Sequence, residues 1–285
     1  MIAQRASDDR ATAAAFASSW NNAREGSVYT REQFLDWIEP LVPADLQGAS
    51  VLELGHGNGS LLVHAADCHP RRLVGVELGD TASVARSNLA GASTQPELIS
   101  GDLCEVVLGG FDVVYCIGVL HHLTDPGAGF KGVLRNTRPG GRFHCWVYGH
   151  EGNEIIRLIV DPVRRTASRL PWWVTKYVLA APLVTPYFLY AKTLKVALAI
   201  MPRSQRLWSK LPLYDYTRWI ANRSFWFFHH VAFDQLVTPQ TRYLKETEVR
   251  QLLDDPLVDP GSVYVIRRNG NSWKFGGRRE VVARE

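Results

Sequence analysis

The stretch Val51-Leu52-Glu53-Leu54-Gly55-His56-Gly57-Asn58-Gly59-Ser60 decides the fold of this 285-residue chain. A short apolar segment typical of a buried strand runs into three glycines at alternate positions, and we expect a helix to begin near Ser60. Glycine tolerates positive φ angles and lets the backbone approach a ligand closely. A strand, a glycine-rich turn and a helix in this order predict a ligand loop at the carboxyl end of a strand.

Outward from this loop, residues 49–149 alternate short apolar segments with helix-like segments such as 81–89 and 126–138. The expected strands are 50–55, 72–78, 96–102, 111–118 and 141–149. Apolar strands that alternate with helices are typical of a parallel sheet covered on both faces. The first part of the chain is therefore predicted to form a five-stranded parallel sheet.

The C-terminal part is expected to complete the same sheet. Residues 247–253 have helical spacing, and segments 262–268 and 272–275 are predicted strands joined by the turn Arg268-Asn269-Gly270-Asn271. The predicted fold class is α/β, a Rossmann-like seven-stranded sheet of five parallel strands plus an antiparallel C-terminal pair, with a mostly helical insertion.

Residues 155–228 form the insertion, because their composition departs from the rest of the chain. They contain five of the nine tryptophans and twelve Lys or Arg residues against two acids, a net charge of +10, whereas the remainder has twenty basic and twenty-six acidic residues. We expect residues 1–48 to form an N-terminal helical cap and 49–154 the ligand-binding core. Residues 229–285 would then return to that core.

Polar residues follow the predicted strands at the edge where the glycine loop lies. Glu77 ends the second strand, about 20 residues after the loop, a distance at which an acid accepts hydrogen bonds from ribose hydroxyls. Leu78 is placed to pack on an adenine ring, and Asp102 to accept from an adenine amino group. Segment 117–122 follows the fourth strand and would line the pocket around the rest of the ligand. These positions predict a nucleoside-containing ligand.

Five motifs occur in order along this core: ELGHGNG (53–59), GVEL (75–78), GD (101–102), FDVVYCIGVLHHLTDP (111–126) and LRNTRPGGRF (134–143). Together they resemble class I S-adenosylmethionine-dependent methyltransferases of the small-molecule type, in particular the quinone-biosynthesis group. The resemblance covers residues 49–149 and implies S-adenosyl-L-methionine as the cofactor. One departure is His56, where this group usually has cysteine.

The resemblance also implies roles for individual positions. Glu53 would orient the amino-acid end of the cofactor, and Ile117 would contact the backbone atoms of that amino-acid end. Glu77 would hold the ribose. The loop glycines Gly55, Gly57 and Gly59 would line the methionine and ribose. Asp102 and Leu103, at the end of the third strand, would contact the adenine.

A nicotinamide-binding loop is the competing interpretation of the glycines. That loop has the pattern G-x-G-x-x-G, whose third glycine would fall on position 60, and Ser60 occupies it. Glu77 suits either cofactor. The segment GVLHHL (118–123) and the closing strand pair favour the methyl donor.

A sulfonium-bound methyl group is already electrophilic, so such an enzyme has mainly to align the acceptor, exclude water and, where needed, accept a proton. The candidate catalytic residues are His122, His150 and His230, because imidazole titrates near neutral pH. A pocket-shaping role for His122 and a helix-face role for His230 are the alternatives. Tyr29 is a candidate cation–π partner of the sulfonium, and simple packing is its alternative.

No metal site is expected, since the four cysteines form no C-x-x-C pair and no H-E-x-x-H motif occurs. The cysteines are interpreted as reduced, buried thiols of a cytoplasmic protein. The polar segment 1–10 predicts no secretory leader. The longest apolar run, 177–191, contains two prolines and is shorter than the ~20 residues that a membrane span needs.

The expected partner is a small-molecule apolar acceptor such as a quinone, phenol or isoprenoid, enclosed by residues 155–228 as an acceptor lid. The charge and aromatic content of this segment also fit peripheral contact with an anionic membrane, or a homo-oligomer interface. A nucleic-acid substrate is disfavoured, because residues 116–119 lack the Pro-Pro-Tyr/Phe type of motif that base-amino methylation uses. The alternative to an enzyme is a cofactor-binding module without turnover.

Overall fold

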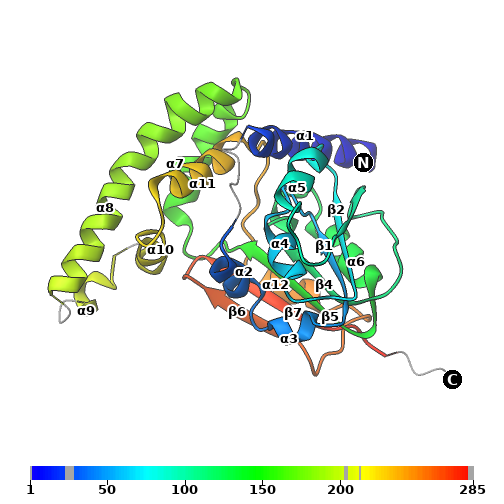
Figure 1. Cartoon of the computed structure of the whole chain (residues 1–285). Coiled ribbons are helices and arrows are strands. Elements are labelled where there is room, and N and C mark those ends of the chain that lie inside the picture. The colour runs from blue at the N-terminus through cyan, green and yellow to red at the C-terminus, as the bar shows by residue number, and fades with distance from the viewer. Residues whose placement is uncertain (1, 23–28, 202–204, 212, 282–285) are drawn as a thin grey trace. The chain divides into compact units, whose positions relative to one another are not determined.

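The computed structural model describes residues 2–22, 29–201, 205–211 and 213–281, and the chain divides into two compact units (Figure 1). Unit 1 comprises Met1–Tyr148, Gln240–Ile266 and Trp273–Glu285. Unit 2 comprises Gly149–Pro239 and Arg267–Ser272.

Unit 1 is built on a seven-stranded sheet with the strand order β3-β2-β1-β4-β5-β7-β6. The first five strands are parallel and the last two are antiparallel, which confirms the predicted fold class. The strand order reverses between β1 and β4, and open α/β sheets bind ligands at the carboxyl ends of strands at such a point. The strands are β1 (Ser50–Leu54), β2 (Arg72–Glu77), β3 (Glu97–Ser100), β4 (Phe111–Ile117), β5 (Thr137–Tyr148), β6 (Tyr264–Arg268) and β7 (Ser272–Arg278).

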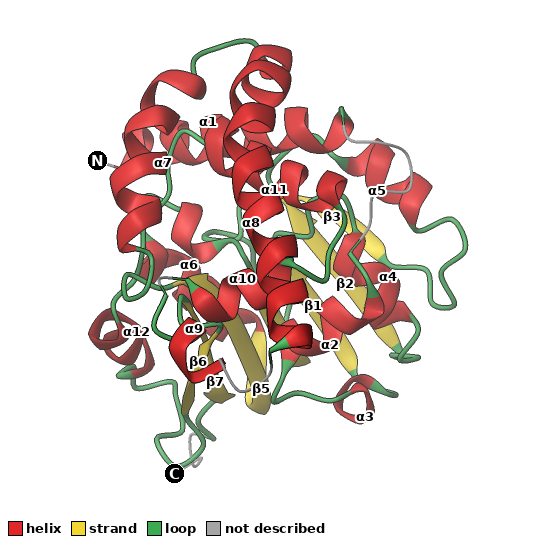
Figure 2. Cartoon of the chain, turned by 90° about the vertical axis from the view of Figure 1, so that its left-hand side faces the viewer, coloured by secondary structure: helices red, strands yellow, loops and turns green. Residues whose placement is uncertain are grey.

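Alternate residues of each parallel strand enter two different apolar cores, as the two-residue period of a strand requires. Leu52 and Val114 pack on one face with α6 (Pro126–Asn136) and α12 (Glu246–Leu253). Val51 and Tyr115 pack on the other face. Figure 2 shows the sheet, in yellow, with helices around it. The helices of the second face are α2 (Arg31–Ile38), α3 (Pro43–Leu46), α4 (Ser60–Ala66) and α5 (Ala82–Asn88).

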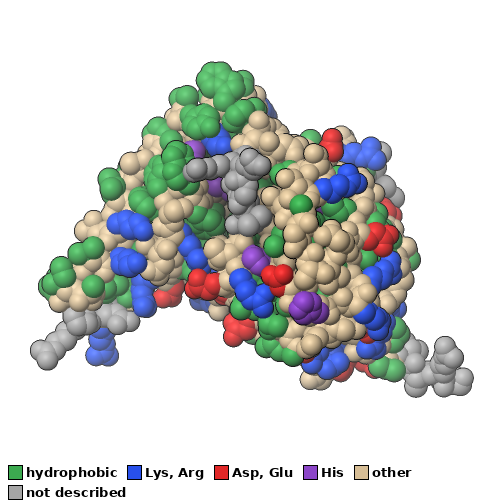
Figure 3. All heavy atoms as spheres, in the orientation of Figure 1, with side chains coloured by type: hydrophobic (Ala, Val, Ile, Leu, Met, Phe, Trp, Pro, Cys, Tyr) green, Lys and Arg blue, Asp and Glu red, His purple; other side chains and the backbone are tan. Residues whose placement is uncertain are grey.

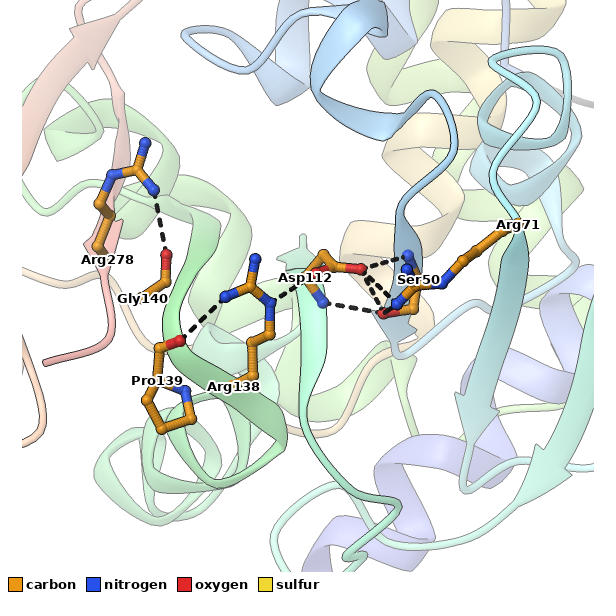
Figure 4. Close-up of polar contacts among 7 residues, drawn as sticks. All are labelled: Ser50, Arg71, Asp112, Arg138, Pro139, Gly140 and Arg278. Carbon is orange, nitrogen blue, oxygen red and sulfur yellow. Dashed lines mark hydrogen bonds and ion pairs between the residues drawn. The ribbon is translucent and has the colours of Figure 1, made fainter. Parts of the chain in front are cut away.

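A charged network joins the amino ends of β1, β4 and β5 (Figure 4). The Ser50 backbone N–H and hydroxyl each donate to Asp112 Oδ2 at 2.8 Å. The Arg71 guanidinium donates to the same oxygen at 2.8 Å, and Arg138 Nε donates to Asp112 Oδ1. Partial burial would by itself raise the pKa of Asp112, but the hydrogen bonds from Ser50 and Arg138 hold it well below its usual range. This carboxylate therefore stays charged and fastens three strand starts together.

Unit 2 is helical, with a small apolar core formed by Val184, Ala191, Ile220, Ala221 and Phe228. Two of its segments, η2 and α8, form one helical run over Val174–Ile200 that is long and apolar enough to cross a membrane by length and composition. This run exceeds the apolar segment 177–191 identified in the sequence. The helices are α7 (Glu154–Ala167), the π-helical η2 (Val174–Ala180), α8 (Ala181–Ile200), α9 (Gln205–Trp208), α10 (Tyr214–Ile220) and α11 (Phe225–Val237).

The boundaries of unit 2 lie outside the predicted insertion, residues 155–228. The Asn153 side-chain amide donates to the carbonyls of Gly149 and Asn271, both at 2.6 Å, so the unit begins before α7 and includes the tip of the β6–β7 hairpin. At its other end α11 continues to Val237. The fifth strand also differs from the prediction, since it begins at Thr137 and not at Gly141.

Candidate functional site

The glycine loop connects β1 to α4 in a conformation that only glycine adopts without strain. Gly55, Gly57 and Gly59 have φ angles of +83°, +53° and +78°, in the left-handed region. A Cβ atom on Gly55 would overlap Val119, and both the Gly55 and His56 N–H groups donate to the Val76 carbonyl. The loop is therefore fixed against the ends of β2 and β4.

Glu77, the last residue of β2, holds this loop with one carboxylate oxygen and the turn after β2 with the other. Oε2 accepts from the Gly57 N–H at 2.9 Å, and Oε1 accepts from the Gly79 N–H at 2.8 Å. The Thr81 hydroxyl donates to the Gly57 carbonyl at 2.6 Å from the opposite side of the loop. Each carboxylate oxygen can accept a further hydrogen bond. Glu77 is thus oriented by neutral donors and keeps acceptor capacity for a pair of hydroxyl groups.

Glu53, in β1, is 1% exposed, and its Oε2 accepts a hydrogen bond from the Tyr115 hydroxyl at 3.0 Å. Burial raises the pKa of Glu53 to about 8, although the Tyr115 hydrogen bond acts in the opposite direction. The negative charge of nearby Glu77 adds to the rise. No positive charge contributes to the pKa of this buried acid. A cationic ligand bound beside it would lower that pKa, and the acid would then ionise.

Residues after β3 were predicted to contact adenine. Asp102 Oδ1 accepts from the Cys104 N–H at 2.8 Å, which orders the turn and leaves Oδ2 as an acceptor. The Leu103 side chain packs in the core with Phe130, under α6. The adenine contact of Leu103 stays a prediction, and backbone atoms would make it because the side chain lies in the core. Leu78 follows β2 and is half-buried, and its contact with the adenine stays a prediction.

The end of β4 carries Ile117 and the histidine pair. Ile117 is buried in the second core, beneath the loop that Gly118 begins with a φ of +77°. His121 Nδ1 accepts from the Tyr148 N–H at 3.3 Å. His122 Nδ1 lies 3.0 Å from the Gln240 carbonyl, so this nitrogen carries a proton and donates it. These contacts fix the two ring orientations at the strand ends.

An aromatic cluster lies beside the histidines at the ends of β4 and β5. Trp37 stacks on Trp146 with ring centroids 5.5 Å apart, and Tyr29 meets Trp37 edge-on at 4.7 Å. Tyr148 lies 4.0 Å from the His121 ring. The Trp146 ring lies beside Gly118, at the end of β4. Trp37 and Trp146 belong to the apolar core on this face of the sheet, and Tyr29 and Tyr148 pack against it.

Helix α1 (Ile2–Asn21) contributes contacts that the sequence analysis missed. Asp9 Oδ1 accepts from the Thr124 N–H and hydroxyl, both at 2.8 Å, and Asn21 donates to the Asp80 carbonyl at 2.9 Å. A Cβ atom on Gly57 would lie 3.3 Å from Trp20 Nε1. The sequence signal was the small-residue face of α1, since Gly79 packs against Ala13 and Ala17. Helix α1 therefore packs on the residues that flank the glycine loop.

The predicted histidines fall in both units. His122 belongs to unit 1, whereas His150 and His230 belong to unit 2. His230 Nε2 lies 3.4 Å from Asp234 Oδ2, one turn away on α11. Tyr29 packs on Trp37, and its carbonyl lies 2.6 Å from His64 Nε2, so the structure shows its packing role. Catalytic roles for the histidines and the cation–π role of Tyr29 stay predictions.

Over residues 2–22, 29–201, 205–211 and 213–281, no group of three or more His, Cys, Asp or Glu side chains is arranged to hold a metal ion. All four cysteines are buried and unbridged. Burial raises the pKa of the Cys104 thiol to about 12, so this thiol is neutral at physiological pH.

Known proteins resemble the core of this chain. Residues 52–143 match the family described as "Methyltransferase domain". A ubiquinone biosynthesis O-methyltransferase of Thiobacillus denitrificans is 35% identical over 118 residues, which cover 40% of this chain and 48% of that protein. One from Pseudomonas syringae is 32% identical over 113 residues, 38% of this chain and 47% of that protein. The matched region thus spans about half the length of these relatives.

Solved structures give a looser likeness. An S-adenosylmethionine-dependent methyltransferase from Mesorhizobium loti is 26% identical over 37% of this chain and 48% of that chain, with a TM-score of 0.34. A magnesium protoporphyrin IX methyltransferase from Synechocystis is 14% identical with a TM-score of 0.46, over 88% of this chain and 82% of that one. The family match and the sheet of unit 1 agree on the same core.

Proposed function

We propose that this chain, whose residues 52–143 form a class I S-adenosylmethionine-dependent methyltransferase domain, transfers a methyl group to oxygen or carbon of a small, apolar or aromatic acceptor. Two features of unit 1 support the proposal. The first is the set of acids at adjacent strand ends around the glycine loop. The second is the aromatic cluster at the ends of β4 and β5.

The cofactor supplies an electrophilic methyl group on a sulfonium. On this proposal Glu77 accepts hydrogen bonds from the ribose hydroxyls, because its two oxygens are already oriented by the Gly57 and Gly79 N–H groups. Asp102 Oδ2 accepts from the adenine amino group. Glu53 ionises and attracts the cationic amino-acid end, and the Tyr115 hydroxyl holds the carboxylate in place. The three acids and the loop suit the chemical groups of one nucleoside sulfonium.

The acceptor is proposed to lie against the aromatic cluster of Tyr29, Trp37, Trp146 and Tyr148. An apolar wall with a few polar groups is the usual lining of a small-molecule site. His121 presents a ring whose Nδ1 accepts from the Tyr148 backbone, which leaves Nε2 as the protonated nitrogen. His122 is the proposed proton acceptor for a phenolic hydroxyl, since its Nδ1 bond to Gln240 leaves Nε2 unprotonated.

A hydroxylated aromatic ring is the first acceptor class to test. The matched relatives are named as O-methyltransferases of ubiquinone biosynthesis, and the aromatic cluster suits a planar ring. The role of residues 155–228 as an acceptor lid, and a homo-oligomer, stay predictions. That the chain does not act on a nucleic acid is also still a prediction.

The single observation that carries the proposal is that Glu53 in β1 and Glu77 at the end of β2 accept hydrogen bonds from neutral donors, the Tyr115 hydroxyl and backbone N–H groups. The test has two stages. Calorimetry with S-adenosylmethionine should show one binding site per chain. Methyl transfer from labelled cofactor to catechols and hydroquinones should then exceed transfer to aliphatic alcohols.

The two stages separate the alternatives. Saturable cofactor binding with no transfer to any acceptor would support the binding module without turnover. No cofactor binding would overturn the proposal itself.

A further inference from the structure

Unit 2 carries most of the exposed large apolar side chains of the molecule. Nineteen such residues occur in the part of the chain that the structure describes, and fourteen of them belong to unit 2, although unit 2 is about a third of the chain. Soluble domains rarely leave extended apolar faces uncovered unless these faces bind something. The fourteen are Ile155, Leu158, Ile159, Leu170, Trp173, Tyr177, Val178, Leu183, Leu189, Tyr190, Val196, Ile200, Met201 and Trp226.

These residues follow the faces of two helices. On α7 the exposed positions Ile155, Leu158 and Ile159 recur at helical spacing, and Leu158 is 77% exposed. On α8 the positions Leu189, Val196 and Ile200 recur in the same way, with 60%, 56% and 73% exposure. A three-and-four spacing places side chains on one side of a helix. Each helix therefore has apolar side chains that face solvent on one side.

Aromatic and basic side chains accompany the apolar faces. Trp173 and Trp226 are 54% and 64% exposed, and tryptophan favours the boundary between lipid and water. Segment 155–228 has twelve basic residues against two acids, and one of those acids, Asp161, is paired with Arg164. Figure 3 shows hydrophobic side chains, in green, and Lys and Arg side chains, in blue, along the helix labelled α8 in Figure 1.

Helix α8 is anchored to its own unit on its other side. Ala191 and Leu194 are buried, and Lys192 Nζ donates to the carbonyls of Ala221 and Arg223 at 2.8 and 3.0 Å. If the Val174–Ile200 run crossed a bilayer, it would have to break these contacts or take α10 and its charged residues into the hydrocarbon region. The helix is therefore built to lie at a surface and not to span the membrane.

We propose that unit 2 is an interfacial docking module for an anionic lipid bilayer. The apolar sides of α7 and α8, with Trp173 and Trp226, enter the head-group region, and the surrounding Lys and Arg side chains contact lipid phosphates. Charge complementarity selects a bilayer with acidic lipids over a neutral one. A nucleic acid is a poorer partner, because it offers charge without an apolar phase. This inference does not depend on methyl transfer.

The test is flotation of the full chain with vesicles of phosphatidylcholine alone or mixed with phosphatidylglycerol. We expect binding to the mixed vesicles at low salt, little binding to phosphatidylcholine, and at least a tenfold loss of binding at high salt or for the double variant Leu158→Glu/Val196→Glu. Val107→Glu is the matched control, since Val107 is 66% exposed in unit 1. This control should bind as the unchanged protein does, and circular dichroism should show that all variants are folded.

Three results would overturn the proposal. The first is no binding to acidic vesicles at low salt. The second is equal binding by the double variant and the unchanged protein. The third is retention in the membrane after alkaline carbonate treatment, which would indicate a spanning helix. If light scattering instead shows a dimer that the double variant dissociates, without vesicle binding, the apolar faces are an interface between copies and the proposal also fails.

Discussion

Acidic side chains at the two ends of the parallel strands in unit 1 have different kinds of hydrogen-bond partners. At the amino ends, Asp112 is paired with the guanidinium groups of Arg71 and Arg138. At the carboxyl ends, Glu77 is held by backbone N–H groups and Glu53 by a phenol. Both sets are ordered by hydrogen bonds, but only the first is neutralised by charge.

This difference separates a structural network from a binding site. A carboxylate that is already neutralised has little to gain from a cationic ligand, whereas an acid held by neutral donors keeps its acceptor capacity or, like Glu53, can ionise when a cation binds. The network at the amino ends should therefore contribute mainly to the free energy of unfolding. The acids at the carboxyl ends should contribute mainly to ligand affinity, at some cost in stability.

The largest expected effect is the pH dependence that Glu53 gives to stability. Its folded pKa is about 8, against an unfolded value of about 4.5, so between these values the folded state holds a proton that the unfolded state has released. The stability contribution is full below pH 4.5 and is lost as the pH rises to about 8. The shift corresponds to at most about 4–5 kcal/mol.

Chemical denaturation of the unchanged protein and Glu53→Gln across this pH range measures the effect. The difference between the two free energies of unfolding should fall as the pH rises and then level off above pH 8. A difference that stays constant would show that Glu53 is ionised in the folded protein and would remove the contrast between the two strand ends.

The second effect belongs to Asp112 and has the opposite sign. Its folded pKa lies below the unfolded value of about 3.8, so its contribution is present above pH 4 and is lost as the pH falls. Asp112→Asn should cost about 2–3 kcal/mol at pH 7, mainly through the Ser50 hydrogen bonds, because the two arginines are half exposed. Denaturation at pH 7, with calorimetry of cofactor binding as a companion, should show lost stability and unchanged affinity.

The third effect is on binding. Glu77→Ala should weaken cofactor affinity by an order of magnitude or more, because a lost charged hydrogen bond costs about 1.5–3 kcal/mol. The matched control is Glu97→Ala, an exposed acid at the start of β3 that pairs with Arg72. Calorimetry should place the control within twofold of the unchanged protein. Equal losses in both variants would indicate a general electrostatic effect and not a contact at Glu77.

The smallest effect concerns helix α1. Trp20→Ala should weaken cofactor affinity by only a few-fold, because Trp20 packs against the backbone at Gly57 and Glu77 keeps its hydrogen bonds. Stopped-flow kinetics should assign this change to faster release. A loss as large as that of Glu77→Ala would make α1 a principal part of the site.

The sequence predicted the parallel strands well because their residues are apolar over whole segments and end in glycine or acid, as β1 and β2 do. The fifth strand was placed too late, since Pro139, Gly140 and Gly141 are typical of a loop, whereas the ladder already pairs Thr137 with Phe111 before a register shift. Local patterns carry no information about such tertiary pairing.

The acids and glycines of the candidate site could be predicted because each follows a recognisable strand. The contacts from Asp9, Trp20 and Trp37 could not, because they join segments far apart in the chain and lie on helices whose patterns fit simple packing. The burial of the Leu103 side chain could not be predicted either, because the sequence does not show which side of the strand end the core occupies.

The most direct test is a crystal structure of the chain with S-adenosylhomocysteine. We expect the ribose hydroxyls to contact the Glu77 carboxylate, the homocysteine end to lie between the glycine loop and Glu53, and Asp102 to face the adenine. A ligand bound away from the carboxyl ends of β1 and β2, with Glu77 contacting only Gly57 and Gly79, would contradict this expectation.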